Sequence, residues 1–242
     1  MILITRPIAD AVELQQELKK KKIPSLIDPL TSFKFQNRKI KFSDAHVYIC
    51  ASQRCVDVLA RTKNINNIRI IVVGKKVARR LKENDFKNIL FIAPDTKQLT
   101  KWMRKKENQQ NNYIYLSGSI INDTFVSELK KYNISFRRKV IYQTILKKSL
   151  NRNTIKILKQ NKITGVVFYS KTAADVYFKL IKKYKISIAS LQQKYFALSP
   201  RIAEHCIKYK MEQGVIKISP KPDQRSILSL IIANKQLINI EK

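Results

Sequence analysis

Short apolar runs alternate with segments of helical periodicity along the whole chain, and this alternation restricts the fold more than any other feature. Residues 2–4 form a β-rich run, after which Ala11, Leu14 and Leu18 mark one face of a helix. Further runs of this kind, each followed by a helical pattern, lie at 47–50, 70–73, 89–92, 113–116, 166–168, 195–198 and 215–218. Such alternation predicts parallel sheets covered by helices, with right-handed crossovers.

The same series of strand and helix units occurs twice. The matching pairs of strands are 2–4 with 113–116, 48–50 with 166–168, 71–73 with 196–198, and 89–92 with 215–218. A helix and a short second strand follow the first strand of each series, at 24–27 and 134–137. Any two α/β halves share periodicity, but here small residues at the strand ends recur as well. We therefore predict two similar parallel-sheet α/β domains that arose by duplication.

Basic residues far outnumber acidic ones, with 49 Lys and Arg against 17 Asp and Glu, and the formal net charge is +32. A chain with this charge attracts anions, so nucleic acid, an anionic membrane and a substrate with several carboxylates are candidate partners. The chain is also rich in Lys, Ile and Asn, as an AT-rich genome would make any protein. Its basic clusters are short and fall at predicted helix ends, where cations complement the helix dipole. We expect no nucleic-acid partner and no membrane partner.

Cysteine use and apolar content point to the cytoplasm. Cys50, Cys55 and Cys206 are odd in number and have no metal-binding spacing, which favours a reducing compartment. The first apolar run stops at Ile4, and no stretch approaches the roughly 18 apolar residues of a membrane span. We expect a cytoplasmic monomer.

Several classes of enzyme lack their usual motifs. The four glycines include no pair spaced as a dinucleotide-binding turn or a phosphate loop. His46 and His205, together with the scattered cysteines, do not make a zinc pattern, and no serine lies in a G-x-S-x-G elbow. We therefore expect neither a metal nor a cofactor, and an enzyme of this composition would work through positioning and hydrogen bonds.

Hydroxyls, glycines and cations follow the predicted strands directly. In parallel α/β sheets, ligands bind beyond the carboxyl ends of the strands. The candidate binding residues there are Thr5, Arg6, Ser52, Gly74, Ser117, Gly118, Ser119, Ser170, Ser199 and Arg201. Helix capping by Ser and Thr is the simpler explanation of the pattern on the motif alone. The two explanations are compatible, because the exposed amides at a capped helix start also bind anions. We expect these strand ends to face one cleft and to bind a small ligand with many carboxylates.

Segments throughout the chain, taken in their order, resemble the uroporphyrinogen-III synthase family. The I-L-I-T-R-P opening resembles that family's first strand and turn, and Val140-Ile141-Tyr142-Gln143-Thr144 is similar to its V-Y-x-T segment. The other matching segments are 48–61, 71–80, 115–118, 166–170 and 196–201. One departure lies after Gly74, where the family often has a threonine within three residues and this chain has Lys75-Lys76-Val77.

The resemblance implies a particular domain arrangement. Family members have two α/β domains, one of them discontinuous, joined by two antiparallel linker strands. If this chain has the family's arrangement, residues 1–34 and 146–242 form the discontinuous domain, and residues 38–140 form the inserted one. The linker strands would lie near 33–37 and 141–145.

The resemblance also implies a reaction. The family cyclises hydroxymethylbilane to uroporphyrinogen III, with inversion of the last pyrrole ring and loss of water, in haem biosynthesis. Such an enzyme is a hydro-lyase that needs no cofactor. Tyr142 matches the family tyrosine proposed to help the hydroxyl leave, since hydroxide is a poor leaving group without a proton donor. A tyrosine that merely packs beside the linker is the structural alternative.

Two other functions stay open from the residues alone. The net charge of +32 suits a basic nucleic-acid-binding α/β protein, although no nucleic-acid motif, aromatic platform or basic tail is present. A two-domain module that binds a small anion without chemistry fits the strand-end pattern as well as an enzyme does.

Overall fold

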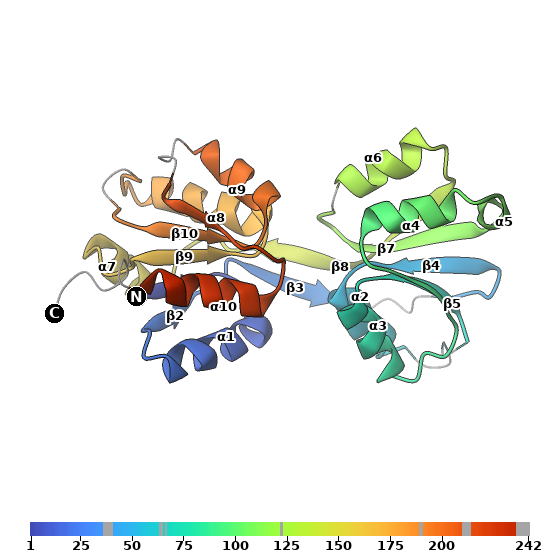
Figure 1. Cartoon of the computed structure of the whole chain (residues 1–242), viewed down its shortest axis with the longest axis horizontal. Coiled ribbons are helices and arrows are strands. Elements are labelled where there is room, and N and C mark those ends of the chain that lie inside the picture. Colours follow the sequence, from blue (N-terminus) through green and yellow to red (C-terminus); the bar gives the residue numbers. More distant parts are fainter. Residues whose placement is uncertain are drawn as a thin grey trace. The chain divides into compact units, whose positions relative to one another are not determined.

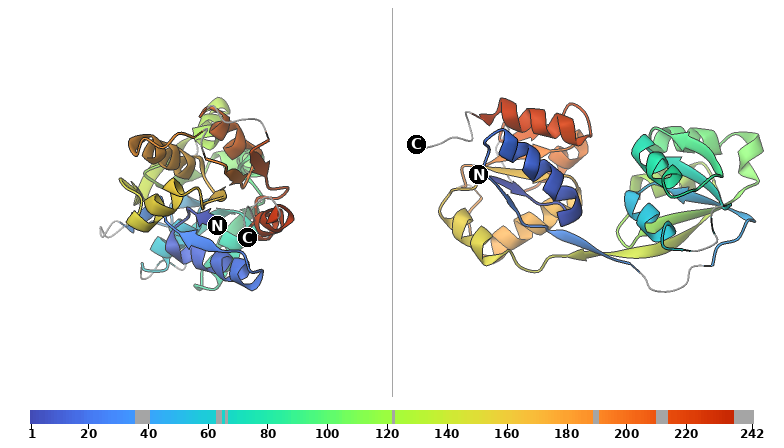
Figure 2. Two further views of the ribbon diagram at one scale, coloured as in Figure 1. Left: turned by 90° about the vertical axis from the view of Figure 1, so that its left-hand side faces the viewer. Right: turned by 90° about the horizontal axis from the view of Figure 1, so that it is seen from below.

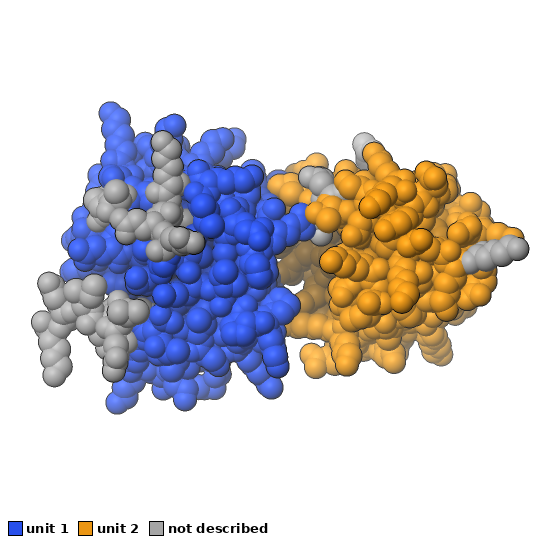
Figure 3. Space-filling model, turned by 45° about the horizontal axis from the view of Figure 1, so that its top comes forward, with its two compact units in different colours: residues 1–32, 145–242 blue, residues 33–144 orange. Residues whose placement is uncertain are grey.

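The computed structural model describes residues 1–35, 41–62, 65, 67–121, 123–188, 191–209 and 214–235. The chain divides into two compact units (Figure 3): unit 1 comprises Met1–Ser32 and Ile145–Lys242, and unit 2 comprises Phe33–Thr144. Both units are built from helices and mainly parallel sheets, which confirms the predicted α/β fold class.

Unit 1 contains a five-stranded sheet in the order β11-β10-β9-β1-β2, and every neighbouring pair in it is parallel. Its strands are β1 (Ile2–Ile4), β2 (Ser25–Ile27), β9 (Gly165–Phe168), β10 (Lys194–Ala197) and β11 (Ile216–Ile218). Its helices are α1 (Ile8–Lys20), α7 (Arg152–Lys159), α8 (Lys171–Lys183), α9 (Pro200–Ile207) and α10 (Gln224–Ala233).

Helices cover both faces of this sheet because its central strands are apolar throughout. All three residues of β1 and all four of β9 are buried, as expected for strands enclosed on both sides. Helices α8 and α9 pack on one face, whereas α1 and α10 lie side by side on the other (Figures 1 and 2). Helices α1 and α10, which are far apart in the sequence, therefore bury their apolar side chains in one hydrophobic layer.

Unit 2 contains a six-stranded sheet in the order β3-β8-β7-β4-β5-β6. Its strands are β3 (Thr31–Phe35), β4 (His46–Cys50), β5 (Arg69–Val73), β6 (Ile89–Ala93), β7 (Asn112–Gly118) and β8 (Phe136–Leu146). Strands β3 and β8 each extend two residues into unit 1. Its helices are α2 (Gln53–Leu59), α3 (Lys75–Lys82), α4 (Thr96–Met103), α5 (Lys106–Gln109) and α6 (Asp123–Lys131). Helices α2 and α3 pack on one face, and α4 and α6 pack on the other (Figure 1).

The two sheets share one strand order. Strands β8-β7-β4-β5-β6 of unit 2 correspond to β2-β1-β9-β10-β11 of unit 1, and β3 is an additional edge strand. The four pairs of strands matched in the sequence occupy equivalent places in these orders. Residues that follow matched strands therefore also lie at equivalent positions of their own sheets.

Strand β8 differs from the expectation. The second strand predicted at 134–137 and the linker strand predicted at 141–145 are parts of one strand, Phe136–Leu146. It is hydrogen-bonded to β7 and to β3, and Figure 1 draws β3 and β8 in opposite directions. The polar run Arg137-Arg138-Lys139 concealed its continuity, because the exposed Arg137 and Arg138 interrupt the apolar pattern from which strands were predicted. Helices α5 and α7 were not predicted either.

The boundaries of unit 2 lie a few residues outside those expected for the inserted domain. Unit 2 runs from residue 33 to 144, whereas the inserted domain was expected at 38–140. Residues 36 and 37 of the first expected linker strand and residue 38 lie outside the described residues.

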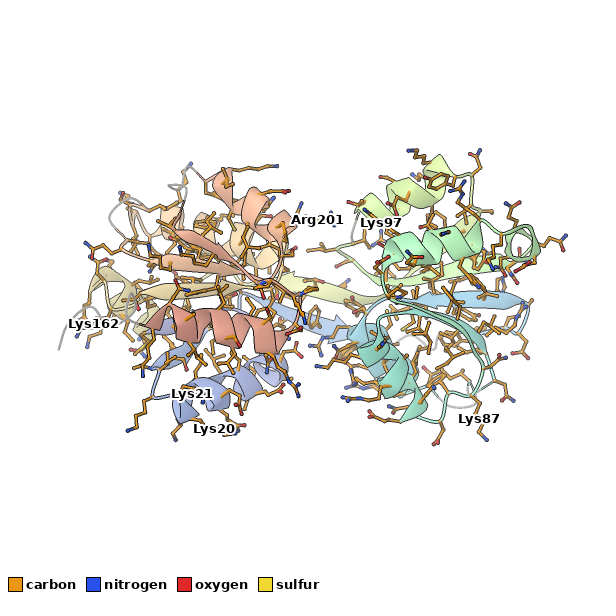
Figure 4. All side chains as sticks on the ribbon, viewed as in Figure 1. Lys20, Lys21, Lys87, Lys97, Lys162 and Arg201 are labelled. Carbon is orange, nitrogen blue, oxygen red and sulfur yellow. The ribbon has the colours of Figure 1, made fainter. Side chains whose placement is uncertain are left out.

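Cationic side chains are spread over many elements. The labelled Lys20 and Lys21 lie together at the end of α1, whereas Lys87, Lys97 and Lys162 lie in other parts of the chain (Figure 4). No helix in the described part of the chain has the length and apolarity to cross a membrane. Within that same part, no three His, Cys, Asp or Glu side chains gather as a metal site.

Candidate functional site

Tyr142 of β8 lies at the centre of a group of predicted residues in unit 2. Its phenolic oxygen donates to the Ser52 hydroxyl over 3.3 Å, and its ring meets Phe33 of β3 edge to face, with the centroids 5.6 Å apart. Only 7% of its surface is exposed. The fold therefore brings together Tyr142 and Ser52, which are 90 positions apart in the sequence.

Gly118, at the end of β7, lies against the ring of Tyr142. A side-chain carbon at Gly118 would lie 2.7 Å from Cζ of that ring and closer still to Cε2. Ser119 continues the contact, because its amide donates to the Tyr142 carbonyl over 2.9 Å and its hydroxyl accepts from the Thr144 amide over 3.0 Å. The loop after β7 thus holds Tyr142 by ring and backbone together.

The surroundings of Tyr142 act on the pKa of its phenol in opposite directions. Burial, the largest influence, raises the pKa of Tyr142 above its ordinary value, and the Ser52 hydrogen bond and the charge of Arg54 act in the opposite direction. The phenol carries its proton throughout the neutral range, as an ordinary tyrosine does. The raised pKa makes it a weaker acid, and the contacts with Ser52 and Arg54 partly offset that loss.

Arg54 is a cation beside this group that the sequence analysis missed. It lies in the first turn of α2, where its amide donates to the capping Ser52 hydroxyl over 3.1 Å, and its guanidinium lies 4.8 Å from the centroid of the Phe33 ring. The Asp57 carboxylate forms salt bridges with the guanidinium groups of Arg54, at 3.1 Å, and Arg80, at 2.6 Å. Since Ser52 was predicted, its neighbours in the same turn could have been considered too.

In unit 1, the side chain of Thr5 is fully buried and donates to the Val167 carbonyl over 2.6 Å. This hydroxyl binds the end of β1 to β9. It is therefore not among the side chains that we propose for the substrate.

Arg6 is held at the same end of the unit 1 sheet. Its Nη1 donates to Oε1 of Gln224 over 2.9 Å, and its guanidinium lies 4.0 Å from the centroid of the Tyr169 ring, which follows β9. Arg6 Nε and the Tyr169 hydroxyl are both buried and make no hydrogen bond within the described structure. Burial raises the pKa of Tyr169, and the charge of Arg6 acts in the opposite direction. The Arg6 guanidinium places a positive charge at this strand end, which suits an anionic ligand.

Tyr169 and Gln224 were not predicted. Tyr169 directly precedes Ser170 at a strand end, so its position could have signalled it. Gln224 lies 218 positions from Arg6, and no local pattern connects the two.

The remaining predicted residues lie at helix starts. The Ser170 hydroxyl caps α8 by accepting from the Ala173 amide over 3.1 Å, whereas Ser199 precedes α9 without a side-chain capping bond. Arg201 lies in the first turn of α9 and is exposed (Figure 4). Gly74 precedes α3 with φ at 92°, a conformation that favours glycine. The three residues after it are Lys75, Lys76 and Val77, so none of them offers a hydroxyl where the family often has a threonine. Lys75 and Lys76 are exposed.

Comparison with known proteins decides the family. A family model described as "Uroporphyrinogen-III synthase HemD" matches residues 12–229. The chain belongs to the uroporphyrinogen-III synthase family. This result confirms the resemblance seen in the sequence, and it does not favour the nucleic-acid-binding or non-catalytic alternatives.

Solved structures of this family share the fold. The uroporphyrinogen-III synthetase from Helicobacter pylori 26695 is 17% identical, with a TM-score of 0.67, over 96% of this chain and 98% of that one. A mutant uroporphyrinogen III synthase from the extremely thermophilic bacterium Thermus thermophilus is 11% identical, with a TM-score of 0.60, over all of both chains. No curated protein matches this chain. At these identities the likeness concerns the fold alone.

Proposed function

We propose that the protein is a hydro-lyase that cyclises hydroxymethylbilane to uroporphyrinogen III, with inversion of the last pyrrole ring and loss of water. The observation that carries this proposal is the Tyr142 phenol, which is protonated at neutral pH and is held by Gly118, Ser119 and Ser52. Membership of the family supplies the substrate.

The reaction balances with one proton donor. Tyr142 gives its proton to the terminal hydroxyl as the carbon–oxygen bond breaks, and water leaves. The last ring is inverted through a spiro intermediate, and a new carbon–carbon bond closes the macrocycle in place of a carbon–hydrogen bond. The proton released there restores the Tyr142 phenol, so the net change is the loss of one water.

The substrate carries acetate and propionate arms, and both units offer cations and donors for them. In unit 1 we assign Arg6, Tyr169, Ser170, Ser199 and Arg201 to carboxylate binding. In unit 2 we assign Ser52, Arg54, Gly74, Gly118 and Ser119 to the same task. The Ser117 side chain is buried and its hydroxyl donates to the Gly118 carbonyl, so it is left out for the same reason as Thr5. Charge-assisted bonds from such groups fix the orientation of a flexible anion, and orientation decides which ring closure is faster.

The proposal extends to the state of the enzyme. It acts as a cytoplasmic monomer, without a cofactor and without nucleic acid. Sedimentation of the purified protein tests the monomer, and activity after exhaustive dialysis against a chelator tests the independence from metal.

An isomer assay tests the function. Hydroxymethylbilane is generated in situ, the protein is added, and the uroporphyrin isomers are separated after oxidation. Spontaneous closure gives the uninverted isomer I, so we expect mainly isomer III with the protein present. Isomer I at the level of the protein-free reaction would reject the proposal.

A further inference from the structure

Arg138 of β8 makes an unusual set of contacts with the loop after β7. Its Nε donates to the Ser117 hydroxyl over 2.9 Å. Its Nη2 donates to the Gly118 carbonyl over 2.6 Å and to the Ser119 carbonyl over 2.9 Å. One guanidinium thus binds three consecutive residues, two of them through the backbone, so it fixes the orientation of their peptide groups.

The sheet is irregular at this point. Ser117 pairs with Val140 and Gly118 pairs with Tyr142, so Ile141 has no partner on β7. A bulge of this kind interrupts the ladder and re-aims the neighbouring side chains, and it occurs often beside active sites. The bonds from Arg138 hold the loop on one side of the bulge, and those between Ser119 and β8 hold it on the other.

The loop in turn sets the position of Tyr142. Gly118 lies so close to the ring that a shift of the loop toward β8 would push the phenol away, and a shift outward would leave the ring less confined. The Ser119 amide bonds to the carbonyl of Tyr142 itself. Any displacement of residues 117–119 is therefore passed on to Tyr142.

We infer that Arg138 is a positioning residue, which holds the loop at 117–119 and thereby places the Tyr142 hydroxyl for proton transfer. The inference rests on the function proposed above. Arg138 is exposed and lies outside the hydrophobic clusters, so its main structural consequence is the order of this loop.

Arg138→Ala and Arg138→Lys test the inference, with Arg137→Ala as the matched control. Arg137 is the preceding residue of β8 and is also exposed, but it contacts His46 and not the loop. Its replacement by alanine removes one positive charge, as Arg138→Ala does, and leaves the loop contacts in place. Two quantities are measured for each protein: amide hydrogen exchange at 117–119 without substrate, and kcat, KM and isomer fraction in the assay above. Circular dichroism verifies folding, and Arg138→Lys serves if the alanine variant does not fold.

We expect Arg138→Ala to speed exchange at the Ser119 amide and to lower kcat about tenfold or more, with KM changed less than about twofold, because a small misplacement of a reacting group is costly. Arg138→Lys is expected to have an exchange rate and a kcat between those of Arg138→Ala and the unaltered protein. A lysine ammonium donates to carbonyls but lacks the planar guanidinium that bonds to several oxygens at once. Arg137→Ala is expected to match the original protein in both readouts.

Three results would overturn the inference. They are unchanged exchange in Arg138→Ala, an unchanged kcat despite faster exchange, and a rise in KM alone, which would make Arg138 a substrate-binding residue. If the unaltered protein yields no isomer III, the proposed function itself fails. The exchange data then still show separately whether Arg138 orders the loop.

Discussion

Gly118 and the ring of Tyr142 occupy adjoining space so closely that position 118 has no room for a side chain. A β-carbon at this position would lie 2.7 Å from Cζ of the ring, below the distance that real contacts reach. A side chain at position 118 would therefore displace the phenol. The absence of a side chain at 118 is as much part of the site as the hydroxyl at 142.

Gly118→Ala is expected to lower kcat about tenfold or more, because the ring must move away from its position. In a Tyr142→Phe background the same substitution should cost less than about twofold, since the hydroxyl it displaces is already gone. The unaltered protein, Gly118→Ala, Tyr142→Phe and the double variant form a double-mutant cycle, in which kcat is measured for each. Equal losses in both backgrounds would show that Gly118 acts independently of Tyr142.

Tyr142→Phe should lower kcat about tenfold to a hundredfold, at the low end of general acid catalysis, because the donor is a weak acid. The protonated phenol is the active form, and burial raises its pKa. Its contribution is therefore complete below about pH 10 and is lost as the pH rises through the raised pKa. The alkaline fall of kcat should disappear in Tyr142→Phe, and the exposed Tyr132→Phe should keep it.

Arg6→Gln should lower kcat/KM about tenfold to a hundredfold, because a hydrogen bond from a charged donor to a carboxylate is worth about 1.5–3 kcal/mol. Lys20→Gln is the control, since Lys20 is exposed and pairs only with Glu17 in the described ion pairs. The initial rate over a range of substrate concentrations measures both. Equal effects of the two substitutions would indicate general charge attraction in place of a specific contact.

Asp28→Ala should lower the free energy of unfolding by about 3 kcal/mol. Asp28 is fully buried and accepts from the Lys147 ammonium and, over 2.9 Å, from the Asn151 amide. Removing one partner leaves the other charge partly buried and unpaired. Asp28→Asn keeps an acceptor and should cost less, about 1–2 kcal/mol.

Urea unfolding measures these losses. Glu83→Gln breaks the exposed pair with Arg79 and should cost less than about 0.5 kcal/mol. A loss in Asp28→Ala as small as that of Glu83→Gln would contradict the assigned role of Asp28.

Cys206 should make the fold sensitive to alkali. Burial, with a smaller contribution from Asp175, raises the pKa of the Cys206 thiol to about 12. The folded pKa exceeds the unfolded one, so the contribution to stability is complete below about pH 8.5 and is lost as the pH rises toward 12. Between pH 8 and 10 this loss amounts to about 1–2 kcal/mol.

Urea unfolding of Cys206→Ala at pH 8 and pH 10 isolates that loss. The variant starts from a lower stability because a buried group is removed, but its stability should fall less between the two pH values. Identical falls in the variant and the unaltered protein would assign the alkaline sensitivity to other groups.

Local patterns in the sequence were enough for the elements that depend on near neighbours. The continuous apolar runs at β1, β4, β5, β9 and β10 could be recognised because buried parallel strands are apolar on both faces. Ser52 and Ser170 could be placed at helix starts because a capping hydroxyl bonds to an amide two or three residues away. The family followed from the order of these units.

Only the tertiary structure decided which of these residues meet. Arg6 joins Gln224, Tyr142 joins Ser52, and Asp28 joins Lys147 across 218, 90 and 119 positions. These partners are selected by strand order and register, which depend on the packing of whole sheets and leave no trace in a local pattern. The bulge opposite Gly118 is of the same kind, since a shift of one residue in register determines where the Tyr142 ring lies.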